Sequence, residues 1–224
     1  MPDTNVGPLA EGLPSDPELL DEAGARHLVE SIYPQPSPGV LAKDIGRIDR
    51  HIRRFIEMSP FCCLATSDKQ GRLDVTPRGD KPGFVKVLDE KTLVLPDRPG
   101  NNRLDSLRNI LSHPEVGMLF LIPGFEETVR INGTARLSVD PRLLPAMAAE
   151  GKNPRSVMVV KVREAYLHCA KAFRRSRLWD PAAQVERSLL PSLSVMIGEQ
   201  LKLPPEQNAE REQRLEEAYR KTLW

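Results

Sequence analysis

The sequence lacks long hydrophobic runs, a basic N-terminus and a large excess of one charge. Its apolar runs, such as 157–160, are far shorter than the roughly 20 residues that span a bilayer, so we expect no membrane segment. Residues 1–25 contain no Lys or Arg and six acidic residues, which argues against a secretory signal. Lys and Arg number 32 and Asp and Glu 31, giving a net charge of +1. This balance argues against a nucleic-acid partner.

Cysteine is scarce, and its placement bears on both compartment and metal binding. The three cysteines are Cys62, Cys63 and Cys169, of which two are adjacent in an apolar run. Adjacent cysteines are poorly placed for a mutual disulfide, and buried reduced thiols are typical of cytoplasmic proteins. No second Cys or His lies at ligand spacing from the pair, so we expect no metal site. These features predict a cytoplasmic, disulfide-free protein.

Familiar catalytic motifs are also missing. The sequence contains no nucleophile elbow, no phosphate-binding Walker loop and no dinucleotide fingerprint. None of the four histidines, His27, His51, His113 and His168, stands in a nucleophile or metal motif. His51 is interpreted as solvent-facing, and His113 as a residue at a helix C-terminus, where its charge favours the helix dipole.

Proline, by contrast, is abundant and marks the domain boundaries. Seven of the 21 prolines fall within residues 1–40, which predicts an extended arm over 1–42, interrupted by a short helix around 18–31. Apolar residues at helical spacing then predict a helix over 43–58, ended by Pro60. We place the folded domain at 43–180 and a peripheral helical tail at 181–224, with a charged helix over 205–221.

From residue 61 the apolar period changes to that of strands. Hairpins are predicted at 61–75 and 84–95, followed by a helix over 102–112 that Pro114 closes. Further strands are predicted at 116–122, 128–139, 157–162 and 165–169, with a short helix over 141–150. Six to seven strands in succession favour an antiparallel barrel or sandwich with helices at its ends over an alternating βαβ sheet.

The candidate site is a polar and basic cluster at strand ends, in residues 76–80, residues 96–103 and Arg130. Guanidinium groups bind phosphate oxygens in pairs, and a helix beginning near Asn102 would aim free N–H groups at the same ligand. The alternative interpretation is that Arg78 and Asp80 are surface turn residues and that Asn101 or Asn102 is merely an N-cap.

Several of these segments resemble one known family. They are Phe-Cys-Cys-Leu-Ala-Thr at 61–66, Asp-Val-Thr-Pro-Arg-Gly-Asp at 74–80, Pro-Asp-Arg-Pro-Gly-Asn-Asn-Arg at 96–103, Glu-Thr-Val-Arg-Ile-Asn-Gly at 127–133 and His-Cys-Ala-Lys-Ala at 168–172. Over about 45–180 the chain resembles the pyridoxamine 5′-phosphate oxidase-like, FMN-binding split-barrel family. Within that family it is most similar to a bacterial subgroup of FMN-dependent enzymes of unassigned substrate.

The resemblance implies a six-stranded antiparallel split β-barrel, a homodimer, and FMN bound between the two subunits. Arg78 or Lys86 would supply the basic residue at the first flavin-contacting strand end. The residues implied to bind the cofactor are Arg78, Lys86, Pro96, Asp97, Arg98, Asn101, Asn102, Arg103, Thr128 and Arg130. Two departures argue against oxidation of pyridoxamine phosphate itself. Gly-Asn-Asn-Arg replaces the Ser-Arg-Lys turn of that enzyme, and Thr128 replaces its flavin-contacting Gln.

The implied function is that of an FMN-dependent oxidoreductase, which transfers a hydride between bound flavin and a small molecule. Because the flavin carries this chemistry in its own ring, missing catalytic motifs are expected. His168 and Lys171 are the candidate catalytic residues, and Lys171 or Arg130 would stabilise the negative charge of reduced flavin. Two alternatives stay open. One is a flavin- or haem-binding module without turnover, and the other is a deazaflavin-dependent enzyme or flavin reductase on the same fold.

Overall fold

The computed structural model describes residues 17–222 and divides into two compact units. Within these residues, one unit comprises 17–42 and 185–191, and the other comprises 43–184 and 192–222. The expectation of an extended arm over residues 1–16 lies outside the described residues.

The first unit contains two α-helices and one 3₁₀ turn. They are α1 (Glu22–Ile32), α2 (Pro38–Leu41) and η2 (Arg187–Leu189). The helix expected around 18–31 is present but begins at Glu22, because Asp21 caps it by accepting a 2.7 Å hydrogen bond from the backbone N–H of Gly24. No side chain of α1 is buried.

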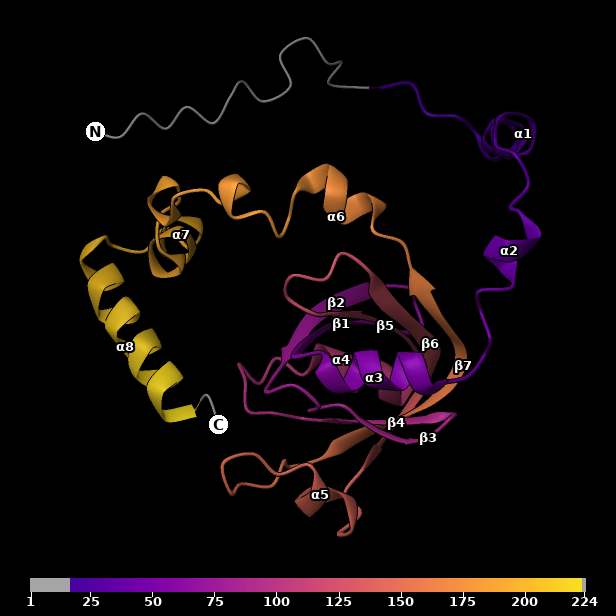
Figure 1. Cartoon of the computed structure of the whole chain (residues 1–224). Helices are drawn as coiled ribbons and strands as arrows, with labels where there is room; N and C mark the ends of the chain where they lie inside the picture. Colours follow the sequence, from indigo (N-terminus) through magenta and orange to yellow (C-terminus); the bar gives the residue numbers. More distant parts are fainter. Residues whose placement is uncertain (1–16, 223–224) are drawn as a thin grey trace. The chain divides into compact units, whose positions relative to one another are not determined.

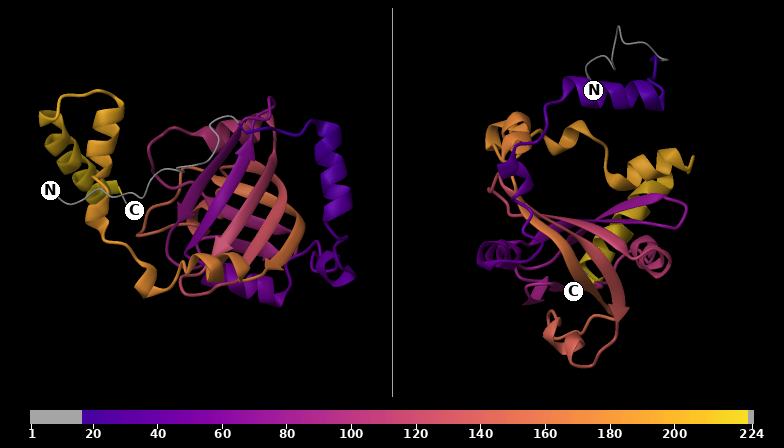
Figure 2. Two further views of the ribbon diagram at one scale, coloured as in Figure 1. Left: turned by 90° about the horizontal axis from the view of Figure 1, so that it is seen from above. Right: turned by 90° about the vertical axis from the view of Figure 1, so that its right-hand side faces the viewer.

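The second unit is built on one antiparallel sheet that curls into an open barrel (Figures 1 and 2). Its strands are β1 (Phe61–Ser67), β2 (Leu73–Gly79), β3 (Lys86–Asp89), β4 (Thr92–Pro96), β5 (Glu115–Leu121), β6 (Thr128–Ser138) and β7 (Val157–His168). Their order is β2-β1-β5-β6-β7-β4-β3. The predicted antiparallel split barrel is therefore confirmed, with seven strands instead of six, and residues 157–168 form one strand instead of two.

The helices of this unit follow the predicted segments with shifted boundaries. They are α3 (Arg50–Met58), α4 (Asp105–Ser112), α5 (Leu143–Ala146), α6 (Lys171–Ser176), η1 (Pro181–Ala183), α7 (Leu193–Gln200) and α8 (Glu206–Thr222). The helix predicted to start at residue 43 starts at Arg50, because the Asp49 carboxylate accepts the N–H groups of His51 and Ile52. The tail forms a helical hairpin, since Lys202 with φ +55° and the prolines that follow break it.

The main hydrophobic core joins α3 to alternate residues of the strands. Ile52, Phe55 and Ile56 form the buried face of α3. In β1 and β5 every second residue is buried, as in Cys62 and Leu64, which is the pattern of strands with one face in a core. This core fixes which face of each strand is turned outward.

A smaller core lies on the opposite face of β4. It joins Val94 of β4, Val157 of β7 and Met147 after α5, and each of these side chains is at most 3% exposed. All five residues of β4 are buried as a result, which explains why Leu93, Val94 and Leu95 form a continuous apolar run instead of an alternating one. The α5 segment is thereby fixed against the sheet.

The longest ladder of the sheet pairs β6 with β7, and it contains a shift of register at Gly133. A Cβ atom added at Gly133 would lie 2.0 Å from the carbonyl oxygen of Lys161. Only glycine allows this approach of the two backbones. Such irregularities increase local twist and help a sheet to curl.

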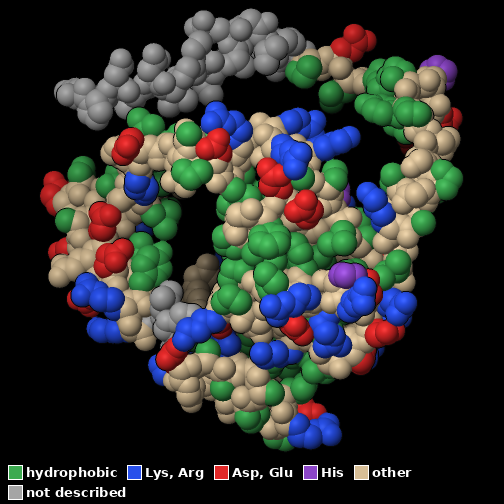
Figure 3. Space-filling view, viewed as in Figure 1, with side chains coloured by type: hydrophobic (Ala, Val, Ile, Leu, Met, Phe, Trp, Pro, Cys, Tyr) green, Lys and Arg blue, Asp and Glu red, His purple; other side chains and the backbone are tan. Residues whose placement is uncertain are grey.

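Many of the charged side chains on the face of the barrel that carries α3 are basic (Figure 3). Figure 3 shows Lys and Arg side chains gathered around α3, with acidic side chains among them. Among residues 17–222, no helix is long and apolar enough to cross a membrane.

The close approach at Gly133 leads to a stability prediction. Gly133→Ala should lower the free energy of unfolding by about 1–3 kcal/mol, because the added methyl group must displace the β7 backbone. Gly39→Ala is the control, since its added Cβ meets no atom within 4 Å. Denaturant titration of both variants measures the difference, and equal midpoints would contradict the argument.

Candidate phosphate-binding cavity

A cavity of about 840 Å³ lies between β2 and the segment that follows β4. The residues that line it include Asp74, Thr76, Arg78, Pro96, Asp97, Arg98, Asn101, Asn102, Arg103, Ser106, Arg155 and Ser156. The two polar segments singled out in the sequence, 76–80 and 96–103, therefore meet at one site. They meet because the curled sheet places its edge strand β2 near the end of β4.

Arg78 is the most constrained cation of the cavity. It lies on β2 opposite Cys62 of β1, and its Nη2 donates a 2.7 Å hydrogen bond to the hydroxyl of Ser106 on α4. Its Nη1 lies 3.6 Å from a carboxylate oxygen of Asp97. The Nε of Arg78 is buried and has no hydrogen-bond partner within residues 17–222. A buried unpaired donor is costly, so this atom calls for an acceptor supplied by a ligand or water.

The loop before α4 has an unusual backbone. Asn102 and Leu104 have φ values of +56° and +61°, which residues other than glycine seldom adopt. The Asn101 amide oxygen holds this turn by accepting the N–H of Arg103 at 3.0 Å. The N-cap of α4 is Leu104, which offers no side-chain cap. The interpretation of Asn101 or Asn102 as an N-cap is therefore wrong, and the first N–H groups of α4 are left without a side-chain cap.

Two further arginines of the cavity are each held by one carboxylate. Arg98 Nε donates to Asp80 at 2.6 Å, and the Asp80 side chain is only 3% exposed. Arg103 Nε pairs with Asp105. The interpretation of Arg78 and Asp80 as surface turn residues is wrong, because both are largely buried and point into this network. Both pairings use Nε, so the terminal nitrogens of Arg98 and Arg103 are available to donate to a ligand.

Sequence reasoning missed three residues of the cavity. Ser106 is a buried residue of α4 that orients Arg78. Arg155 and Ser156 belong to the connection before β7, and the Ser156 carbonyl oxygen accepts the N–H of Asp97 at 3.0 Å. No local pattern indicates these positions, because they reach the cavity through the pairing of β4 with β7.

Other residues assigned to the cofactor or to catalysis do not line this cavity. Lys86 lines a second cavity instead. Thr128 is buried with its hydroxyl unpaired within the described chain, and the Arg130 guanidinium lies 5.3 Å from the ring centre of Tyr166. His168 ends β7 and Lys171 begins α6, both exposed. These five assignments stay predictions that depend on an assembled site.

The segment after β7 is fastened to the barrel by aromatic contacts. Trp179 stacks on Phe173 with ring centres 5.9 Å apart, and its indole N–H donates to the carbonyl oxygen of Phe125 at 2.7 Å. Arg174 pairs with Glu126 at 2.7 Å. Trp179 is thus a packing residue that anchors the end of the barrel domain.

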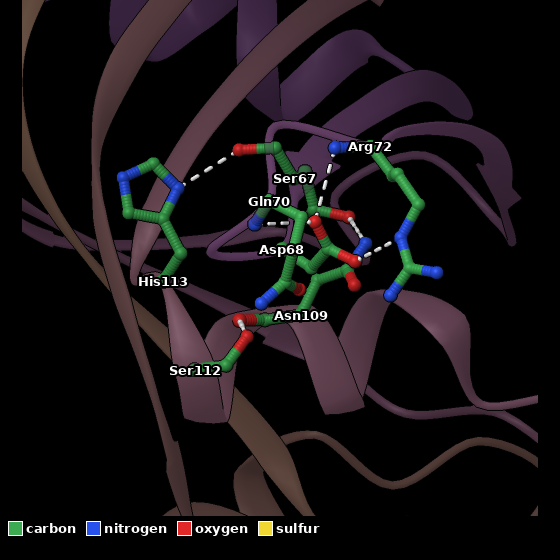
Figure 4. A network of polar contacts seen from close by, with 8 residues as sticks. Ser67, Asp68, Gln70, Arg72, Asn109, Ser112 and His113 are labelled. Atoms are coloured by element: carbon green, nitrogen blue, oxygen red, sulfur yellow. Dashed lines mark hydrogen bonds and ion pairs between the residues drawn. The ribbon is translucent and has the colours of Figure 1, made fainter.

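The opposite end of α4 is held by a separate polar network (Figure 4). His113 is the C-cap of α4, and its Nδ1 lies 2.8 Å from the hydroxyl of Ser67. Asn109 donates to the Thr66 hydroxyl at 3.0 Å. Asp68 closes the β1–β2 turn by accepting the N–H groups of Gln70 and Arg72. These contacts fix α4 to β1, and so they fix the N-terminus of α4 at the cavity.

The cysteines differ in environment. Burial raises the pKa of Cys62 to about 12, although the nearby Arg78 charge opposes this. The backbone N–H of Lys171 and, to a smaller extent, the Lys171 charge lower the pKa of the exposed Cys169 thiol. Within residues 17–222, no group of three or more His, Cys, Asp or Glu side chains is placed to hold a metal ion.

The curled sheet and the cavity at its open edge define a split-barrel protein. The family model described as pyridoxamine 5′-phosphate oxidase matches residues 48–169, more than half of the chain. The chain therefore belongs to the pyridoxamine 5′-phosphate oxidase family. No curated protein matches the sequence.

The chain is similar to several solved structures at low identity. A candidate pyridoxamine 5′-phosphate oxidase of Lactobacillus delbrueckii is 20% identical, with a TM-score of 0.45 and coverage of 55% of this chain and 98% of that one. HupZ of Group A Streptococcus is 17% identical, with a TM-score of 0.43 and coverage of 53% and 91%. HutZ of Vibrio cholerae, a heme storage protein, is 17% identical, with a TM-score of 0.38 and coverage of 55% and 94%.

The contrast between the thiols predicts their order of reaction. At about pH 8, a thiol reagent should modify Cys169 first, because it is exposed and its pKa is lowered, while Cys62 should react only on unfolding. Peptide mass mapping at successive times gives the order. Cys169→Ser should remove the fast phase, and early labelling of Cys62 would contradict the burial of β1.

Proposed function

We propose that the protein is an FMN-dependent oxidoreductase that holds the phosphate of FMN in the 840 Å³ cavity and acts on a small molecule. The observation that carries the proposal is the gathering of Arg78, Arg98 and Arg103 around one cavity next to a helix N-terminus, together with the unpaired Nε of Arg78. A phosphate oxygen would satisfy that donor.

The residues of the cavity fit a phosphate monoester. Arg78 would donate from Nε while Ser106 holds its Nη2 in place. The uncapped first turn of α4 would add backbone N–H groups and a favourable helix dipole. Arg98 and Arg103 would donate from their terminal nitrogens while Asp80 and Asp105 hold their Nε atoms. Preset side chains bind with less loss of conformational entropy.

When bound, FMN supplies the hydride donor or acceptor in its ring. The protein's part is to bind the phosphate, orient the ring and set its electrostatics. His168, Lys171 and Arg130 are the candidates for contacts with the ring or the substrate, and in a single chain they lie outside the phosphate cavity. They would act at the flavin of an assembled dimer.

The outer face of the sheet supports a homodimer. Outward-facing residues of β2, β1 and β5 form two apolar rows, Val75, Ala65 and Gly117 and then Pro77, Cys63 and Leu119. Val75 is 66% exposed although it is a large apolar side chain at the centre of a strand. A second copy of the chain would cover these rows. Residues from both faces of β2 line the cavity, Val75 and Pro77 among them, so the cavity would lie at the edge of that interface.

The first test is the visible absorbance spectrum of the purified protein, with mass identification of any ligand that heat releases. A flavin spectrum and release of FMN would support the proposal. A haem spectrum, a deazaflavin, or a colourless protein that binds no added FMN would overturn it.

Removal of two cavity cations should release the cofactor. Arg98→Ala with Arg103→Ala should weaken FMN binding by about a hundredfold or more, because two charge-assisted donors are lost. Flavin fluorescence on titration measures the affinity. The matched control is Arg54→Ala with Arg136→Ala, two exposed arginines outside the cavity. Full retention of FMN in the first variant would show that the phosphate lies elsewhere.

A charge on the outer face should separate the subunits. Val75→Glu should give a monomer by light scattering, because both copies would bury a carboxylate. Leu88→Glu on β3, another exposed apolar residue, is the control and should stay dimeric. A monomeric wild type that retains FMN would refute the interface.

A further inference from the structure

A second, smaller cavity adjoins the first. Its volume is about 270 Å³, and it lies between the β2–β3 connection and the segment after α5. Its lining consists of Asp80, Lys81, Pro82, Gly83, Phe84, Lys86, Arg98 and residues 146–150. Phe84 and Arg98 line both cavities. Arg98 therefore stands in the wall between them.

The charges around this cavity leave one ammonium group uncompensated. Arg98 pairs with Asp80, and Lys81 pairs with Glu150. The ammonium group of Lys86 has no ion-pair partner among residues 17–222, and it lies about 4.0 Å from the site of an added Cβ at Gly83. Three cations of the lining, Lys81, Lys86 and Arg98, thus stand against two carboxylates. One of these, Asp80, already accepts hydrogen bonds from Arg98 and from the backbone N–H of Lys81.

Both walls of the cavity are fixed. On one side, the N–H of Asp80 donates to the carbonyl oxygen of Pro60 at 3.1 Å, and Gly83 takes a φ of +80° where an added Cβ would lie 3.3 Å from the carbonyl oxygen of Glu57. On the other side, Met147 is anchored in the smaller core. Glu150 and Gly151 both have positive φ in a two-residue turn, which holds Glu150 against Lys81.

We infer that this second cavity binds a small anion, a phosphate or a carboxylate, between the Lys86 ammonium and the terminal nitrogens of Arg98. Arg98 donates its Nε to Asp80, and its two Nη groups make no hydrogen bond to the described residues. A lysine and an arginine that line one cavity are common donors for such an anion.

The shared arginine couples the two cavities. An anion at either site draws on the same guanidinium group, so occupation of one should weaken binding at the other, and the effect must be reciprocal. This coupling rests on the proposed function, since it requires the FMN phosphate in the larger cavity. The anion site itself does not.

Calorimetric titration of the full, flavin-free chain with inorganic phosphate tests the site. We expect the wild type to bind a second phosphate besides the one in the larger cavity. Lys86→Gln should lose that second phosphate or bind it about tenfold more weakly, while Lys86→Arg should retain it. Lys69→Gln, which removes an exposed lysine from the β1–β2 turn, is the matched control and should bind like the wild type. Identical isotherms for Lys86→Gln and wild type would overturn the inference.

The same titration on FMN-loaded protein tests the coupling. Phosphate should bind to the second cavity about threefold or more weakly when FMN is present than when it is absent. Equal affinity in both states would refute the coupling and leave the anion site standing. A chain that binds no FMN would refute the proposed function, while the flavin-free titration would still decide the second cavity.

Discussion

The curl of the seven-stranded sheet brings its edge strand β2 to the end of β4, and both cavities depend on this return. Without it, Asp80 after β2 and Arg98 after β4 would belong to separate surfaces. The register shift at Gly133 lies within the longest ladder, where the β6 and β7 backbones approach too closely for any side chain. One glycine therefore has consequences for a binding site formed by other strands.

Charge placement at the larger cavity is a compromise between stability and binding. An arginine left alone near a core would be costly, and the largely buried Arg78 and Arg98 each have a nearby carboxylate, as does the exposed Arg103. These pairings leave each arginine with N–H donors for a ligand. Asp80 and Asp105 accept only from the Nε atoms of Arg98 and Arg103, and the Nε of Arg78 has no partner among residues 17–222. The acidic residues position the cations without neutralising every donor. Arg98 also lines the second cavity, where its terminal nitrogens stay available because Asp80 accepts only from its Nε.

Sequence patterns predicted the strands well, because residues such as Cys62 and Leu64 alternate with the period of a half-buried sheet. They also located the polar segments of the site. They failed where the outcome depends on backbone conformation or distant pairing. The start of α4 was misplaced because the positive φ of Leu104 leaves no trace in apolar spacing. The burial of Asp80 depends on Arg98, which only the folded chain brings near. Lys86 is close to Arg78 in sequence, yet it lines a different cavity.

The pairing of β4 with β7 has a consequence for the order in which the molecule is made. Thr92 pairs with Lys161 and Pro96 with Val157, so these partners lie 69 and 61 residues apart along the chain. During synthesis, the β1–β2 and β3–β4 hairpins can close while the chain is still short, whereas β4 gains its second neighbour only when the last strand is made. The strand that precedes the loop with Asn102 and Arg103 is therefore paired on both sides only after β7 has been synthesised. The larger cavity is therefore complete only after the last strand of the sheet has been synthesised.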